Sequence, residues 1–258
     1  MKELNAVITI AYRDLMKLLR DRTRLISSLI FPFIFIGILG GSLQAGLGAS
    51  VGINLLTFTF TGVLVQTLFM SAAQGVISLI DDRENDFSQE IFVSPISRYT
   101  IVFGKILGET LVALVQGIGI IAFGLVLGIQ FSLQLFLAML PIAIIVCLFG
   151  GAFGVVILAN LGTRRAADQI FNFIMLPQYF LAGVFNPIQN LPWYLDILSK
   201  LSPLRYAVDL ARGVFYAGSP DYLVVLASPL VNLAIIAAEF AVFLIFGTVL
   251  FVRRERNR

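Results

Sequence analysis

The sequence predicts an all-α integral membrane protein. Six transmembrane helices are expected, with an amphipathic interfacial helix at the N-terminus and external re-entrant or surface helices before the last span. Of the 258 residues, 59% are hydrophobic and only 13% are charged, whereas a soluble domain carries about 25% charged residues. The hydrophobic residues form runs near the length of about 20 residues that a spanning helix needs. This composition excludes an ordinary soluble enzyme and predicts a single membrane domain over residues 1–258.

Residues 3–22 are predicted to form the interfacial helix. Apolar residues recur there at the spacing of a helix with one apolar face, and Arg13, Asp14 and Lys17 are expected elsewhere on the helix. Such a helix lies flat on the inner membrane surface. It acts either as a lever between a cytoplasmic partner and the first span or as a simple membrane anchor.

Six apolar runs are predicted to cross the membrane. No charged residue occurs between Leu25 and Ile80, where the glycines at 40–52 are expected to separate the first two spans. The fifth run is short and is interrupted by Pro177. The predicted spans are residues 25–43, 53–80, 106–129, 133–158, 170–185 and 223–252.

The distribution of lysine and arginine predicts how these spans are oriented. Of the 18 basic residues, 15 lie in the two terminal tails and in the connections after the second and fourth spans. Positive charge accumulates in cytoplasmic connections, so both termini and the connection 81–105 are predicted to be cytoplasmic. Anionic lipid headgroups are the expected neighbours of this charge, and no nucleic-acid partner is expected.

The segment 186–222 is predicted to lie on the external side, before the last span. Apolar residues from Ile197 to Ala211 recur there at helical spacing, opposite Asp209 and Arg212. Trp193 suits an anchor at the level of the lipid headgroups. The segment forms either re-entrant or surface helices or a plain external cap.

The connection 81–105 has the features of a docking surface. Acidic residues surround Arg83, three bulky apolar residues follow at 91–93, and Pro95 ends any helix. A buried aromatic side chain with charges at its rim is a common anchor between proteins. We therefore predict that this segment docks on another protein, with a solvated loop as the alternative.

Two motifs resemble those of ABC-2-type transporter permeases. One runs from Arg83-Glu84 through Glu90–Arg98 to Gly104-Lys105, and the other is Leu201–Gly213 before the last span. These permeases are the membrane subunits of ATP-driven exporters, including bacterial drug-resistance pumps of the daunorubicin type. The resemblance covers nearly the whole chain and departs at Asp86-Phe87, where the family often has Gly-Thr.

This resemblance implies how the chain works with its partners. Residues 84–93 would be the coupling helix that contacts an ABC ATPase subunit, itself expected as a dimer, and a second permease copy or a sibling permease would complete the pathway. The implied location is the cytoplasmic membrane of a bacterium or archaeon. The implied coupling residues are Glu84, Phe87, Glu90, Ile91, Phe92 and Val93.

The sequence contains no phosphate-binding-loop motif for ATP. Gly104-Lys105 lacks the upstream glycine and the following hydroxyl residue of a phosphate-binding loop. The chain also has no histidine, which excludes imidazole chemistry. We expect no catalytic residue, no metal site and no cofactor in this chain, with ATP and Mg bound by the partner ATPase.

Polar residues form a stripe along one side of the second predicted span. An unpaired amide or hydroxyl in hydrocarbon is costly, so the stripe either packs against other helices or lines the translocation route. Neutral polar groups mixed with aromatics suit a hydrophobic or amphipathic substrate, a drug or a lipid, and a lipid-linked glycan is the alternative. A strongly anionic cargo would need deep basic residues, which the predicted spans lack. The candidate path residues are Thr57, Thr61, Gln66, Ser71, Gln74, Asn172 and Gln178.

Glu109 and Glu239 are the only ionisable residues inside the predicted spans. Intramembrane carboxylates are candidates for function. Glu109 lies four residues after Lys105, which allows an ion pair on one helix face and favours a structural role. For Glu239, proton coupling, cation recognition and an interhelical hydrogen bond stay open. A proton-coupled secondary transporter that uses both carboxylates is therefore the alternative mechanism.

Overall fold

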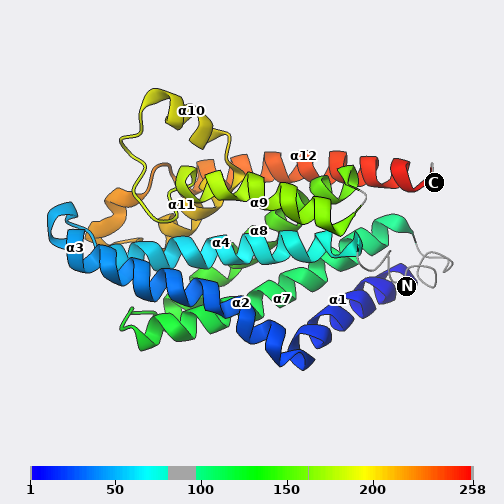
Figure 1. The fold of residues 1–258 in the computed structure, drawn as a ribbon, viewed down its shortest axis with the longest axis horizontal. Coiled ribbons are helices and arrows are strands. Elements are labelled where there is room, and N and C mark those ends of the chain that lie inside the picture. Colours follow the sequence, from blue (N-terminus) through cyan, green and yellow to red (C-terminus); the bar gives the residue numbers. More distant parts are fainter. Residues whose placement is uncertain (1, 81–96, 162, 257–258) are drawn as a thin grey trace.

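Long helices lie side by side along the longest axis of the molecule, and both termini lie at one end (Figure 1). The computed structural model describes residues 2–80, 97–161 and 163–256, and every regular element in these ranges is helical, which confirms the all-α class. The helices α10 (Trp193–Lys200) and α11 (Pro203–Phe215) lie toward the opposite end. The predicted coupling residues fall outside the described residues: Glu84, Phe87, Glu90, Ile91, Phe92 and Val93.

The predicted interfacial helix is present as α1 (Lys2–Arg20). Asp21 separates it from α2 (Arg22–Ile34), where its carboxylate accepts a hydrogen bond from the Arg24 backbone N–H at 2.9 Å and so caps α2. Asp14 is only 4% exposed, which corrects its expected place away from the apolar face. Residues 11, 14 and 18 are three and four positions apart, so they share the buried face of α1.

The first spanning segment is longer than expected. Helix α2, a π-helix over Phe35–Gly40 and α3 (Gly41–Val51) form one run from Arg22 to Val51. The expected break at the glycines occurs only at the last of them, because a glycine inside a helix costs only about 1 kcal/mol and residues 40–48 stay helical. The run ends at Gly52, whose φ of 74° is a left-handed conformation that glycine adopts without strain.

The centre of the bundle is α4 (Leu55–Ile77), packed between α7 (Arg98–Val126) and α8 (Leu133–Asn160). Over its apolar window 72% of α4 is buried, against 17% for the first and last spanning segments. Two glycines of α8 allow close contact, since a Cβ at Gly150 or Gly154 would collide with the α4 backbone. Helix α7 begins at Arg98 and not at 106, so the end of the predicted coupling segment is already helical.

Five helical segments among the described residues are long and apolar enough to cross a membrane. The expected fifth span, 170–185, corresponds to α9 (Arg164–Leu181), which is not one of the five. It is short and carries charged residues in its first turns, including Arg164 and Asp168. A sixth crossing therefore stays a prediction.

The last span, α12 (Pro229–Arg256), begins six residues later than the expected residue 223. A short 3-10 helix over Pro220–Val224 precedes it. The Asp209 carboxylate accepts hydrogen bonds from the backbone N–H groups of Leu226 and Ala227, at 2.7 and 2.9 Å. These bonds hold the chain in a turn outside the helix, and Pro229 then suits the first helical turn.

Residues 197–212 also do not form the single amphipathic pattern that their spacing predicts. The chain bends between α10 and α11, so its apolar residues do not form one continuous face. Asp209 and Arg212 are 3% and 4% exposed, whereas Ile197 and Leu201 are 52% and 72% exposed. Helix α11 is buried on its charged side because its carboxylate and guanidinium both find backbone partners there.

Candidate functional site

A polar cavity of about 540 Å³ lies among α1, α2, α4, α7 and α9. Its volume falls within the range of small-molecule sites, roughly 300–1,000 Å³. Most of the lining residues carry amides, hydroxyls or basic groups, although the wall itself is about equally polar and apolar. The lining residues are Lys17, Arg24, Ser28, Phe31, Pro32, Gln66, Thr67, Met70, Ser71, Gln74, Gly75, Ser78, Gln116, Arg164, Asn172 and Tyr179.

Four of the candidate path residues meet in this cavity. Gln66, Ser71 and Gln74 come from α4 and Asn172 from α9. The Gln66 side-chain oxygen is buried without a hydrogen-bond partner, and the Tyr179 hydroxyl contacts the Met70 sulfur at 2.7 Å. The cavity therefore offers amide and hydroxyl groups that can bind the polar part of a molecule.

The other three candidates lie elsewhere. Thr57 lines a separate cavity of about 480 Å³. Thr61 donates to the Phe58 carbonyl at 2.9 Å and accepts from Arg212 Nε at 3.3 Å. The Gln178 side-chain oxygen accepts a hydrogen bond from the Ser202 hydroxyl at 3.1 Å, which joins α9 to the start of α11. Thr61 and Gln178 therefore pair with other helices, whereas a role of the cavity residues in a translocation route stays a prediction.

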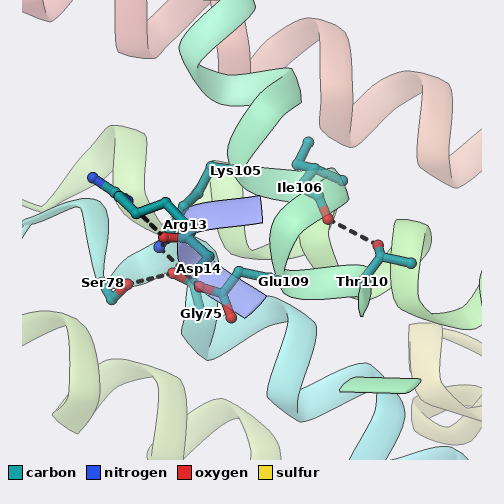
Figure 2. Close-up of polar contacts among 8 residues, drawn as sticks. All are labelled: Arg13, Asp14, Gly75, Ser78, Lys105, Ile106, Glu109 and Thr110. Atoms are coloured by element: carbon teal, nitrogen blue, oxygen red, sulfur yellow. Dashed lines mark hydrogen bonds and ion pairs between the residues drawn. The ribbon is translucent and has the colours of Figure 1, made fainter. Parts of the chain in front are cut away.

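Buried charges meet beside the cavity, at the start of α7. Lys105 Nζ lies 2.8 Å from Glu109 Oε1 and 3.0 Å from Asp14 Oδ2, and these side chains are 3–4% exposed (Figure 2). We call Asp14, Lys105 and Glu109 the inner charge cluster. Arg13 reaches it from its rim, with a nitrogen 2.8 Å from Asp14 Oδ1. The Lys105–Glu109 pair is the one that the four-residue spacing predicts.

The inner charge cluster joins three helices. Asp14 comes from α1, Lys105 and Glu109 from α7, and Glu109 lies against Gly75 of α4 (Figure 2). A Cβ at residue 75 would collide with the Glu109 carboxylate, so only glycine leaves room for it. Glu109 Oε2 is buried without a hydrogen bond. The cluster is therefore held together by ion pairs, and its hydrogen bonds are incomplete.

Sequence reasoning missed Asp14 and the basic residues of the cavity. Lys17, Arg24 and Arg164 lie outside the predicted spans, where their charge marked only the cytoplasmic side. The available signal for Asp14 was its position three residues after Ala11 and four residues before Leu18, both of which are buried. Glu239 lies half-buried on α12 and belongs neither to the cavity lining nor to the inner charge cluster, so the structure does not bring the two carboxylates together.

The model of one protein family, described as ABC-2 type transporter, matches residues 5–216. The chain belongs to this family. The permease is 27% identical over 207 residues to ycf38 of Cyanophora paradoxa, which is named as a transport permease; the match covers 79% of this chain and 71% of that protein. It is also 27% identical over 208 residues to ycf38 of Porphyra purpurea, over 76% of this chain and 69% of that one.

A more distant relative carries a more specific name. YbhR of Escherichia coli strain K12, named as a multidrug ABC transporter permease, is 26% identical over 140 residues, which cover 54% of this chain and 38% of that protein. Family membership makes the chain a multi-pass integral membrane protein and the permease subunit of an ABC transporter. Such a permease is not itself an enzyme, and it works with an ATPase partner subunit.

Proposed function

We propose that this permease belongs to an exporter that moves a hydrophobic or amphipathic substrate, a drug or a lipid, outward across the cytoplasmic membrane. Two ATPase subunits would hydrolyse ATP on its inner face. The polar cavity carries this proposal, because it gathers four candidate path residues next to the buried charges of α1 and α7. The outward direction follows the family resemblance.

The cavity fits a route shared with a second permease copy or a sibling permease. Asn172 lines the cavity from α9 although it is exposed on the isolated chain, beside Phe173 at 80% exposure. An exposed amide is costly in hydrocarbon. A second permease packed against α9 would cover it and close the cavity, with α9 as the sixth crossing.

The proposed topology places both termini and residues 81–105 in the cytoplasm and 186–222 outside. Both termini lie at one end of the helices and α10 toward the other, as this topology requires (Figure 1). The described end of α4 and the start of α7 flank the coupling segment. Because the inner charge cluster ties α1 and α4 to α7, force applied to that segment would reach all three helices.

The proposal is tested by uncoupling. In proteoliposomes holding the permease and its ATPase, Phe92→Ala or Glu90→Lys should lower ATP-driven transport about tenfold or more while ATP hydrolysis continues, because the docking contact is lost. Phe246→Ala is the matched control, since Phe246 is 63% exposed on α12 and does not belong to the coupling segment. Normal transport by the Phe92 and Glu90 variants would contradict the coupling assignment.

A proton-coupled mechanism is the second candidate, favoured by one observation: a carboxylate oxygen of Glu239 is buried without a hydrogen-bond partner. In the ATP-driven account, Glu239→Gln leaves ATP-driven transport within about twofold, because no proton has to move. Transport by the permease alone that follows a proton gradient and stops in Glu239→Gln would favour this second candidate.

A further inference from the structure

Three basic side chains line the polar cavity from three different helices. Lys17 comes from α1, Arg24 from α2 and Arg164 from α9. No acidic side chain occurs among the described residues that line the cavity. The predicted spans contain no basic residue, so the sequence predicted no site for an anion. Lys17, Arg24 and Arg164 lie outside those spans, at helix ends that come together in the fold.

Among the described residues, the carboxylates nearest to this wall mostly have other partners. Arg164 Nε lies 2.9 Å from Asp168 Oδ2, but Asp168 is 40% exposed and outside the lining. Asp14 already faces Arg13 and Lys105. Asp21 accepts the backbone N–H of Arg24 as a helix cap. Within the described part of the chain, three basic side chains therefore line the wall, and one of them, Arg164, is paired with a carboxylate.

We propose that the cavity binds an amphiphile with an anionic headgroup, such as a phosphate. Lys17, Arg24 and Arg164 would hold the anion through charge-assisted hydrogen bonds, for which the arginine fork is well suited. The amides of Gln66, Gln74 and Asn172 would bind the neutral polar part of the headgroup.

The apolar residues of the lining indicate where the apolar tail of such a molecule would lie. Phe31, Pro32 and Met70 form an apolar part of the same wall, next to exposed apolar residues of α2 such as Ile30 at 52% exposure and Ile34 at 48%. A tail would leave the cavity along this face toward lipid. The inference rests on the proposed function and narrows its substrate class from amphipathic molecules in general to anionic ones.

Binding to the full-length permease, purified in a neutral maltoside detergent, tests this inference. Native mass spectrometry or thermophoresis would compare dodecyl phosphate, the uncharged octaethylene glycol monododecyl ether, and inorganic phosphate. The test variant is Lys17→Gln/Arg24→Gln/Arg164→Gln. The matched control is Arg20→Gln/Arg22→Gln/Arg165→Gln, three exposed basic residues of the same helices or their ends that do not line the cavity.

We expect dodecyl phosphate to bind the native permease, and to bind the test variant about tenfold or more weakly. The control variant should bind within about twofold of native. Added salt should weaken binding to the native protein more than to the test variant, because screening acts on charge. Unchanged thermal unfolding of the test variant would show that a loss of binding is not a loss of folding.

Equal binding of dodecyl phosphate to the test and control variants would overturn the inference, as would equally tight binding of the uncharged ether. Inorganic phosphate that binds as tightly as dodecyl phosphate would point to a free-anion site and would also contradict it. ATP-driven transport of a neutral amphiphile that still depends on Phe92 would overturn this inference alone and leave the proposed function intact.

Discussion

Two groups of buried charges, toward opposite ends of the helices, are built from different partners (Figure 1). We call the first, Asp209 and Arg212 on α11, the outer anchor. Arg212 donates to the carbonyls of Phe58 and Val184 at 3.1 and 3.4 Å, and its guanidinium lies 3.5 Å from the centre of the Phe58 ring. Asp209 accepts two backbone N–H groups and the amide of Asn232, the last at 2.7 Å.

The inner charge cluster differs because its charges pair with one another. Lys105 bridges Asp14 and Glu109, and a Glu109 oxygen has no hydrogen bond. Backbone partners fix the outer anchor in one arrangement, whereas ion pairs between side chains can lengthen and re-form when helices shift. Burial alone therefore does not define the role of a charge. The outer anchor suits a segment that stays fixed, and the inner charge cluster suits a joint that transmits force.

The largest expected effect is on the outer anchor. Arg212→Met should lower stability by about 3–5 kcal/mol, because removing a buried charge leaves its partners unpaired. Thermal unfolding in detergent measures this loss. Asp209→Asn/Arg212→Met should stay destabilised, since the carbonyls of Phe58 and Val184 still lose the donor that Arg212 supplies. Arg205→Met is the control on the same helix, since the Arg205 side chain is 13% exposed and its ion-pair partner Asp196 is 37% exposed; an equal loss there would contradict a special role for Arg212.

The inner charge cluster should respond differently to neutralisation. Lys105→Met leaves two buried carboxylates together and should cost about 3–5 kcal/mol. The triple variant Asp14→Asn/Lys105→Met/Glu109→Gln should recover most of that stability in the same unfolding assay, because replacing a whole buried ion group is often neutral.

ATP-driven transport should nevertheless stay low in that triple variant, since the joint between α1 and α7 is gone. Lys200→Met removes an exposed ion pair to Asp196, 2.7 Å long, and should change neither stability nor transport measurably. If the triple variant transports like the native protein, the inner charge cluster has only a structural role and does not transmit force.

A smaller effect is expected at the contact with α4. Gly75→Ala forces the Glu109 carboxylate away from its place and should destabilise by about 1–3 kcal/mol. Gly41→Ala, where the added Cβ meets no atom within 4 Å, should instead stabilise by roughly 0.5–1 kcal/mol. Equal unfolding temperatures for the two variants would show that Glu109 moves without cost.

The helices were predictable from the sequence because long apolar runs have few alternatives in a bilayer. Helix boundaries were less predictable: glycines 40–48 stay helical, and the bonds of Asp209 delay α12 to residue 229. The Lys105–Glu109 pair follows from local spacing. Asp14, Lys17 and Arg164 gain their importance from contacts between helices far apart in sequence, which periodicity does not encode.

The central claim is that a separate ATPase drives this permease through the connection between α4 and α7. The most direct measurement is uptake of two fluorescent amphiphiles, an anthracycline and a phospholipid with a labelled tail, by inside-out proteoliposomes. The account predicts that uptake of at least one probe requires both ATP and the ATPase partner and persists when a protonophore collapses the proton gradient. Uptake by the permease alone, driven by that gradient without ATP, would contradict it.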